Sequence, residues 1–308
     1  ALVGATAPGG QETVSLVTLA PDAPLDLQLT STHVLATGSD PGPLTMAREG
    51  RLLLATDGFG TVHAFDLAAP SAPERGYTLA AAADRLAVSA SQVFVMQDAT
   101  LDLRERRGPG DVPPLRVSRT MLPRYRTVIG SGPVVYAQRY EDASVLVPVD
   151  FTNPRVPRHG DPLDLGFGSD LTYADGLLVV TDGSERLDLW DLGDPDGVRW
   201  LRSLDDVSRL GGGHLGDGVL ALAGFDGVGT ILYDVSDPER PVRGGGIATA
   251  FPRAVGDGLL ITGGGSRPDL WDVSDVHRPR RLAEFDTDGN ALASARGRGH
   301  AFLVVERL

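Results

Sequence analysis

The sequence has neither cysteine nor lysine among its 308 residues. Without cysteine the chain forms no disulfide, no thiolate metal site and no cysteine nucleophile. Glycine triplets occur at 211–213 and 263–265, but a phosphate-binding P-loop also needs a lysine, so this class of nucleotide site is excluded. No apolar run reaches 18 residues, and we therefore expect no membrane-spanning helix.

Positive charge is scarce, because the chain has 28 arginines and 41 acidic residues, which gives a net charge of −13. Binding to nucleic acid depends on clustered cations that neutralise phosphates, so the acidic balance argues against a nucleic-acid partner. The same balance argues against an anionic membrane surface. The sequence begins at Ala1 rather than at methionine, which we interpret as a mature form after removal of a signal peptide, with a trimmed chain as the alternative.

A short string recurs along the chain: an aromatic or aliphatic residue, then aspartate, an apolar residue and a polar turn with proline. The copies are Phe65-Asp66-Leu67, Val149-Asp150-Phe151, Trp190-Asp191-Leu192, Tyr233-Asp234-Val235 and Trp271-Asp272-Val273. Successive aspartates from Asp150 onward lie 41, 43 and 38 residues apart, and Asp66 precedes Asp150 by 84, which is two steps. We place the missing copy at Leu101-Asp102-Leu103-Arg104. A period near 40 without helical patterning predicts a β-propeller with four-stranded blades.

Turn residues divide each repeat into four short strands, here termed a to d. Asp-Gly pairs between apolar runs predict tight a–b hairpins, because both turn positions favour positive φ. These pairs are Asp175-Gly176, Asp217-Gly218 and Asp257-Gly258, with Glu49-Gly50 and Ser131-Gly132 as variants.

The two ends of the chain each supply half a blade. Strands a and b are expected at 292–295 and 301–305, and strands c and d at 14–19 and 25–29. We therefore predict a single seven-bladed domain closed by a composite blade, which removes the open sheet edge. The blades are placed at 30–80, 81–120, 121–162, 163–204, 205–247, 248–288, and 289–308 joined to 1–29.

The fullest string, Tyr233-Asp234-Val235-Ser236-Asp237-Pro238-Glu239-Arg240-Pro241, resembles the LVIVD-repeat family of bacterial β-propellers. The resemblance extends over the chain at the level of the repeat, although the copy near 101–115 departs strongly. It implies the propeller fold and a secreted or cell-surface location, and it implies no catalytic residue. The repeated aspartates are expected to accept hydrogen bonds from the following turn, and the aromatic residues before them to pack between blades.

Many aspartates fall in the predicted b–c and d–a loops, which share one face of a propeller. Asp57, Asp182 and Asp226 are the candidates for a Ca²⁺ site, because hard cations prefer carboxylate and carbonyl oxygens. None of these loops matches a full calcium-loop pattern, and aspartate also favours turns by itself. The metal site and plain turn chemistry therefore both stay open.

Four residues on predicted inner strands are candidates for binding a ligand: His214, Arg253, Arg296 and Arg126. They would give the channel mouth a cationic wall that suits an anion. The alternative is that the arginines pair with rim aspartates, where exposed ion pairs contribute little.

We expect an extracytoplasmic binding or scaffold protein that presents its rim loops and channel mouth to another protein or a small ligand. The longest loops are expected at 29–43 and 104–114. The alternative is a hydrolase or lyase at the channel mouth, which requires His214, Arg253 and a carboxylate to converge.

Overall fold

The computed structural model describes most of the chain. The described residues are 12–22, 26–38, 46–49, 51–57, 61–69, 72–80, 83, 85–88, 91–97, 100–106, 114–121, 125–130, 133–139, 142–153, 155–166, 170–181, 186–193, 198–204, 210–224, 229–248, 251–263, 267–284, 290–297 and 300–307.

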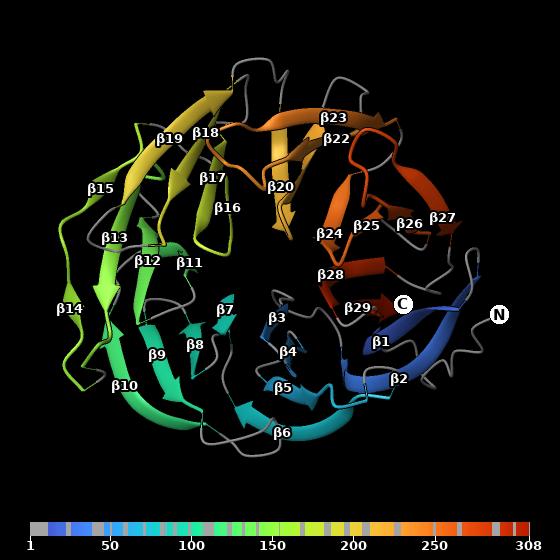
Figure 1. The fold of residues 1–308 in the computed structure, drawn as a ribbon. Coiled ribbons are helices and arrows are strands. Elements are labelled where there is room, and N and C mark those ends of the chain that lie inside the picture. The colour runs from blue at the N-terminus through green and yellow to red at the C-terminus, as the bar shows by residue number, and fades with distance from the viewer. Residues whose placement is uncertain are drawn as a thin grey trace.

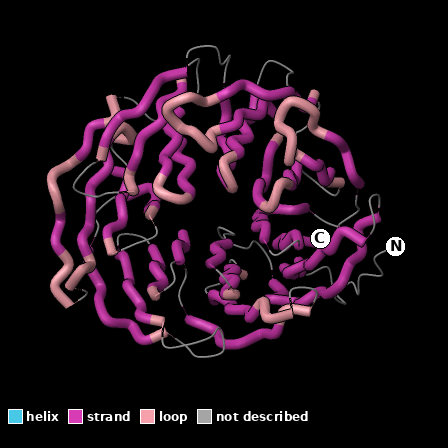
Figure 2. Tube along the Cα trace, in the orientation of Figure 1, coloured by secondary structure: helices cyan, strands magenta, loops and turns pink. Residues whose placement is uncertain are grey.

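Every regular element in these residues is a β-strand, and the strands form sheets arranged around a ring (Figures 1 and 2). Six sheets consist of strands consecutive in the sequence. The first two contain β3 (Met46–Glu49), β4 (Leu52–Thr56), β5 (Thr61–Asp66) and β6 (Glu74–Ala80), then β7 (Arg85–Val88), β8 (Gln92–Gln97), β9 (Thr100–Glu105) and β10 (Leu115–Met121). The third contains β11 (Tyr125–Ile129), β12 (Val134–Arg139), β13 (Val145–Asp150), β14 (Arg158–His159) and β15 (Leu163–Asp164). The fourth contains β16 (Asp170–Ala174), β17 (Leu177–Thr181), β18 (Leu187–Asp191) and β19 (Arg199–Leu204).

The fifth sheet contains β20 (Leu210–Gly216), β21 (Val219–Gly224), β22 (Gly229–Asp234) and β23 (Val242–Ile247). The sixth contains β24 (Pro252–Gly256), β25 (Leu259–Thr262), β26 (Asp269–Asp272) and β27 (Arg280–Glu284). In each sheet the first strand lies nearest the centre of the ring and the last lies outermost (Figure 1). The all-β propeller with four-stranded blades is therefore confirmed.

A further sheet joins the two ends of the chain, in the order β2, β1, β29, β28. It contains β28 (Asn290–Gly297), β29 (His300–Arg307), β1 (Glu12–Asp22) and β2 (Asp26–Gly38). The central pairing is antiparallel and runs from Thr13↔Arg307 to Leu19↔Ala301. The predicted pairing of the last strands with the first is confirmed, and β1 and β29 lie side by side in Figure 1.

The predicted loop at 29–43 was wrong over its first part. Strand β2 continues to Gly38 and keeps its pairing with β1 through two register shifts, so residues 29–38 belong to the sheet. A bulge lets a strand continue past a poor match instead of ending there. The second loop does lie between β9 and β10, and residues 107–113 of it are outside the described part.

Tight a–b hairpins form at three of the predicted turns. Asp175, Asp217 and Asp257 have φ near +50°, and the glycine after each also has positive φ. Two consecutive residues at positive φ define the turn that matches the twist of a hairpin. Aspartate tolerates this region better than most side chains, so the Asp-Gly pairs were sound predictors.

The aspartate that ends each strand c holds the next turn, as expected. The Oδ1 atom of Asp234 accepts hydrogen bonds from the backbone N–H of Ser236 at 2.9 Å and from its hydroxyl at 2.6 Å, and Asp272 binds Ser274 in the same way. Backbone N–H groups two residues on also bind Asp66, Asp150 and Asp191. The apolar residue after the aspartate then donates its N–H to the a–b turn, for example Val235 to the carbonyl of Gly218 at 2.7 Å. The repeated string therefore fastens strand c to the a–b hairpin.

The repeat copy assigned at Asp102 was three residues out of register. Asp102 lies within β9 opposite Val95, just as Asp188 lies within β18 opposite Val180. Glu105 occupies the end position that Asp191 holds in its blade, and the next residue, Arg106, makes the corresponding hydrogen bond to Ser91. Glutamate at the end position hid the true alignment.

Pro148 interrupts the outer edge of the third sheet. It has no N–H to donate to the ladder. Strand β13 therefore pairs with β14 at Val149–Asp150 and with β15 at Val145–Leu146, while Gly160 between them donates to the carbonyl of Pro148 at 2.9 Å.

The hydrophobic core lies between neighbouring blades. Phe94 of β8 and Phe151 after β13 are almost fully buried, with ring centroids 5.5 Å apart. Tyr233 packs in a cluster that includes Val179 and Leu189 of the preceding blade. Such side chains each contribute about 1.5–3 kcal/mol when fully buried. The expected packing of the repeat aromatics between blades is confirmed for Trp190, Tyr233 and Trp271.

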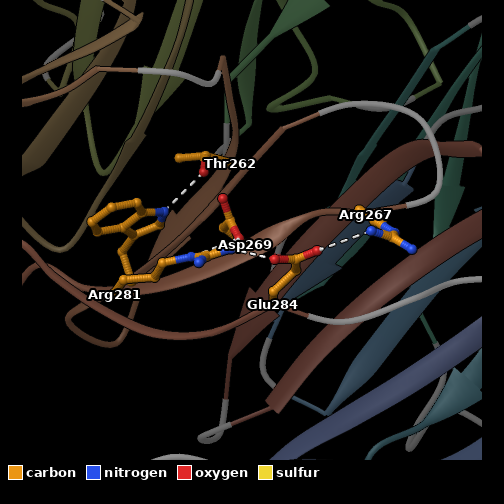
Figure 3. Close-up of polar contacts among 6 residues, drawn as sticks. Thr262, Arg267, Asp269, Arg281 and Glu284 are labelled. Carbon is orange, nitrogen blue, oxygen red and sulfur yellow. Dashed lines mark hydrogen bonds and ion pairs between the residues drawn. The ribbon is translucent and has the colours of Figure 1, made fainter. Parts of the chain in front are cut away.

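Thr262 and Val180 occupy the same register position in their blades, and this predicts opposite effects of exchanging them. Thr262 accepts a hydrogen bond from the indole N–H of Trp271 at 2.9 Å (Figure 3), whereas the buried indole N–H of Trp190 has no hydrogen-bond partner among the described residues. Thr262→Val should lower the free energy of unfolding by about 1–3 kcal/mol, since it strands a buried donor.

The reciprocal variant Val180→Thr should cost clearly less or stabilise the protein, because it supplies an acceptor that Trp190 lacks. Urea unfolding curves of both variants measure the difference. Equal losses in the two variants would show that the indole hydrogen bond contributes nothing.

Candidate functional site

Two candidate ligand-binding residues lie close together on the inner wall of the ring, and they are the only such pair among the described residues. His214 lies in β20 and Arg253 in β24, the first strands of the fifth and sixth sheets, which lie next to each other (Figure 1). The inner strands are linked in series: the Thr172 hydroxyl of β16 donates to the carbonyl of Gly213 at 2.7 Å, and His214 donates to the carbonyl of Pro252. These bonds fix where His214 stands.

Burial, and to a smaller extent the positive charge of Arg253, lower the pKa of His214 to about 4 against the opposing effect of the hydrogen bond to Pro252. A histidine with this pKa is neutral at physiological pH. His214 therefore uses its single N–H on the Pro252 carbonyl and keeps one acceptor nitrogen, rather than carrying a positive charge.

Arg253 is half-buried and supplies the positive charge of this wall. Its Nε donates to the carbonyl of Gly263 at 2.8 Å. Gly263 has φ of +99° and directly follows strand β25. The bond therefore holds the Arg253 side chain toward the face of the ring that carries the b–c loops. A planar guanidinium suits carboxylate and phosphate oxygens.

The other two candidates lie on inner strands too, Arg126 on β11 and Arg296 on β28, but their side chains are outside the described part of the structure. The sequence thus placed all four candidates on inner strands correctly.

Asp57, the first metal candidate, is buried and uses both carboxylate oxygens within its own blade. One accepts from the N–H of Thr61 at 3.0 Å and the other lies 3.1 Å from Nε2 of His63. Burial lowers the pKa of His63, although the bond to Asp57 opposes this shift. Asp182 and Asp226 lie outside the described residues, where the metal prediction stays untested. Within the described ranges no three histidine or acidic side chains are grouped to hold a metal ion.

Sequence reasoning missed a polar position within strand c, three residues before the repeat aspartate. It holds His63, Asp102, Asp188 and Asp269 in four blades. Each acidic member meets an arginine: Asp102 binds Arg119, Asp188 binds Arg186, and Asp269 binds Arg281, which also contacts Glu284 (Figure 3). The signal was present in the matching strings Leu101-Asp102-Leu103 and Leu187-Asp188-Leu189.

This arrangement of sheets and inner-wall residues defines a β-propeller. No family model matches the chain, and no curated protein matches it. In the part that the structure describes, no helix has the length and hydropathy needed to cross a bilayer.

Solved structures with the same fold are found at low sequence identity. Apo AztD from Citrobacter koseri is 12% identical with a TM-score of 0.62, and the match covers 95% of this chain and 98% of that one. The Cps50 (Swd1) β-propeller domain from Myceliophteria thermophila is 13% identical with a TM-score of 0.60, covering 89% and 99%. The Pan2 WD40 domain from Neurospora crassa is 9% identical with a TM-score of 0.60, covering 86% and 89%. At these identities the similarity shows the fold alone.

The lowered pKa of His214 predicts a pH dependence of stability. Because its folded pKa lies below the unfolded value of 6.5, the unfolded chain takes up the proton first as the pH falls. The contribution is complete above about pH 6.5, decreases toward about pH 4 and then levels off, with a total of at most about 3 kcal/mol.

His214→Gln keeps a side-chain N–H donor but does not titrate, so its unfolding free energy should fall less than that of the wild type over this window. Urea unfolding at several pH values checks this. Parallel pH profiles would place the His214 pKa near 6.5 and contradict its burial.

Proposed function

We propose that the protein is a non-catalytic binding or scaffold module that presents the mouth of its central channel and its rim loops to a partner. In this proposal the composite sheet of β28, β29, β1 and β2 serves as a seventh blade, and the protein belongs with the LVIVD-repeat propellers outside the cytoplasm. The inner strands β24, β28 and β3 contact one another in turn, which supports a composite blade within the ring. The repeated string supports the family resemblance.

One observation carries the choice of binding surface: a fixed cation, Arg253, lies beside a neutral histidine, His214, on the adjacent inner strand. The charge of Arg253 acts on His214, and each side chain is held by a backbone carbonyl of the blade to which Arg253 belongs. A pre-positioned guanidinium is suited to a carboxylate or phosphate group. The single N–H of neutral His214 is already donated to Pro252, so the attraction for an anion comes from Arg253. The ligand class that this favours is a small anion, or an acidic side chain of a protein.

The alternative of a hydrolase or lyase needs a carboxylate beside His214. The groups that shift the pKa of His214 are its surroundings, Arg253 and the Pro252 carbonyl, and none of them is a carboxylate. A general base works best with a pKa near the working pH, and a pKa of about 4 is far below neutrality. These facts favour binding over catalysis at this wall.

Inorganic phosphate is a suitable first probe of this site. Phosphate should raise the melting temperature saturably, because a ligand that binds only the folded state stabilises it. Arg253→Gln should abolish the rise, and Arg243→Gln, which changes an exposed arginine on the outer strand β23, should leave it intact. Bound phosphate should also raise the pKa of His214, measured by NMR. If phosphate still raises the melting temperature of the Arg253→Gln variant, the anion binds elsewhere and this site is rejected.

The calcium prediction has a separate test, because it concerns Asp57, Asp182 and Asp226 rather than His214 and Arg253. Chelator-treated protein should gain melting temperature on addition of Ca²⁺ if the b–c loops hold the ion, and Asp226→Asn should remove that gain. Asp57→Asn serves as a contrast, because Asp57 already binds Thr61 and His63 and should affect stability without Ca²⁺. If millimolar Ca²⁺ does not raise the melting temperature, these aspartates serve only to form turns.

A further inference from the structure

A cavity of about 350 Å³ opens between the fourth and fifth sheets, at the face formed by the a–b and c–d turns. This face is opposite to the b–c and d–a loops considered above, since alternate turns of an antiparallel blade emerge at opposite ends. Its apolar lining includes Leu177, Leu215, Val235 and Pro238. The volume is at the lower end of the range for ligand pockets, about 300–1,000 Å³, and suits one or two side chains.

The next junction around the ring shows why this one is open. Between the fifth and sixth sheets, Val276 is buried against the outer strand β23, and its carbonyl accepts a hydrogen bond from Gly245 at 2.7 Å. A Cβ atom on Gly244 would collide with the backbone of Val276. The close approach therefore depends on glycine in the outer strand.

At the open junction the corresponding residues are larger. The outer strands β19 and β23 can be aligned by their pairing with strand c, since Arg199 pairs with Asp191 and Val242 with Asp234. In this alignment Leu201 of β19 corresponds to Gly244 of β23. Pro238 is the counterpart of Val276, three residues after the valine that follows strand c. Because Leu201 has a side chain, the turn of Pro238 cannot dock as Val276 does, and the cavity remains.

Acidic groups border this cavity. Asp175 and Asp217 line its inner end on consecutive a–b turns, and both are exposed. Next to Pro238, the Glu239 carboxylate accepts a hydrogen bond from Arg199 at 3.0 Å. The Asp191 carboxylate accepts one from Nε of the same arginine at 3.4 Å. Arg199 thus contacts two of these carboxylates, Asp191 and Glu239, in a protein whose net charge is −13.

We propose that this cavity, here called the blade 4–5 groove, docks a partner protein through a peptide segment in which an apolar side chain adjoins an arginine or lysine. The apolar side chain fills the space over Leu177, Leu215 and Val235. The neighbouring cation lies against Asp175 and Asp217. Charge complementarity selects this occupant, because an acidic segment would meet like charge at the rim. The groove is independent of the inner wall proposed above.

The test uses the full chain and a defined probe, the peptide acetyl-Ala-Leu-Arg-Ala-amide, with acetyl-Ala-Leu-Glu-Ala-amide as its matched acidic partner. Titration followed by two-dimensional NMR should give saturable shifts at 174–177, 215–218 and 235–238 for the arginine peptide. The acidic peptide should bind several-fold more weakly. Absence of saturable shifts at millimolar peptide, or equal binding of both peptides, would overturn the proposal.

The turn geometry offers closely matched variants. Asp175→Asn combined with Asp217→Asn removes both charges, and asparagine tolerates the positive φ of these turns. This variant should weaken binding about fivefold, the sum expected of two partly exposed ion pairs. Asp257→Asn makes the same change on the a–b turn of the sixth sheet. It keeps the backbone N–H that Asp257 donates to the Asp217 carboxylate, and it should leave binding unchanged. Equal weakening by Asp257→Asn would show a general charge effect and reject the groove.

A steric variant completes the test. Pro238→Trp should fill the groove and abolish binding, and the turn accepts a residue other than proline because Val276 holds the same position in the next blade. Thermal unfolding establishes that each variant is folded. Retained binding in a folded Pro238→Trp protein would show that the peptide binds elsewhere.

Discussion

The ring depends on the antiparallel pairing of β1 with β29. Seven residue pairs from Thr13↔Arg307 to Leu19↔Ala301 join the two ends of the chain. An open ring would leave two strand edges with unpaired N–H and C=O groups, which invite aggregation. This pairing also has the longest sequence separation in the fold. The entropy cost of bringing the two ends together is therefore offset only when the intervening sheets have formed. Unlike the remaining sheets, which are local hairpins, the closing sheet requires the whole chain.

Within the ring, each blade depends on its neighbour for its core. Phe94 meets Phe151 across one junction, and Tyr233 meets Val179 and Leu189 across another. A single four-stranded blade cannot bury both of its faces alone. The backbone braces between turn and strand, such as Val235 to Gly218, keep each blade rigid enough for this packing. Stability is consequently shared between junctions, and the cavity between the fourth and fifth sheets marks a junction that is less completely packed.

The features that were predictable from sequence are those with a local cause. Asp-Gly pairs give the a–b turns because positive φ is a property of two residues, and the repeat aspartates bind N–H groups two residues away. Register was harder, because Asp102 and Glu105 are both acidic and only the pairing with β8 distinguishes them. The extent of β2 was missed because two bulges break its alternation. The His63–Asp57 pair and the proximity of His214 to Arg253 arise from pairing between strands, which spacing alone does not reveal.

The absence of lysine acquires a structural meaning from the acidic position within strand c. The side chain of Asp188 is only 1% exposed, and a buried carboxylate needs several donors to offset its lost hydration. Arg186 offers Nε and Nη2 to its two oxygens at 3.2 and 2.9 Å, and the hydroxyl of Ser203 adds a third donor. Arg119 approaches Asp102 with the same pair of nitrogens. The planar guanidinium fork matches both oxygens of a carboxylate at once, which the single ammonium of lysine does not. A lysine in place of Arg186 or Arg119 would therefore leave one oxygen of Asp188 or Asp102 without its charged donor.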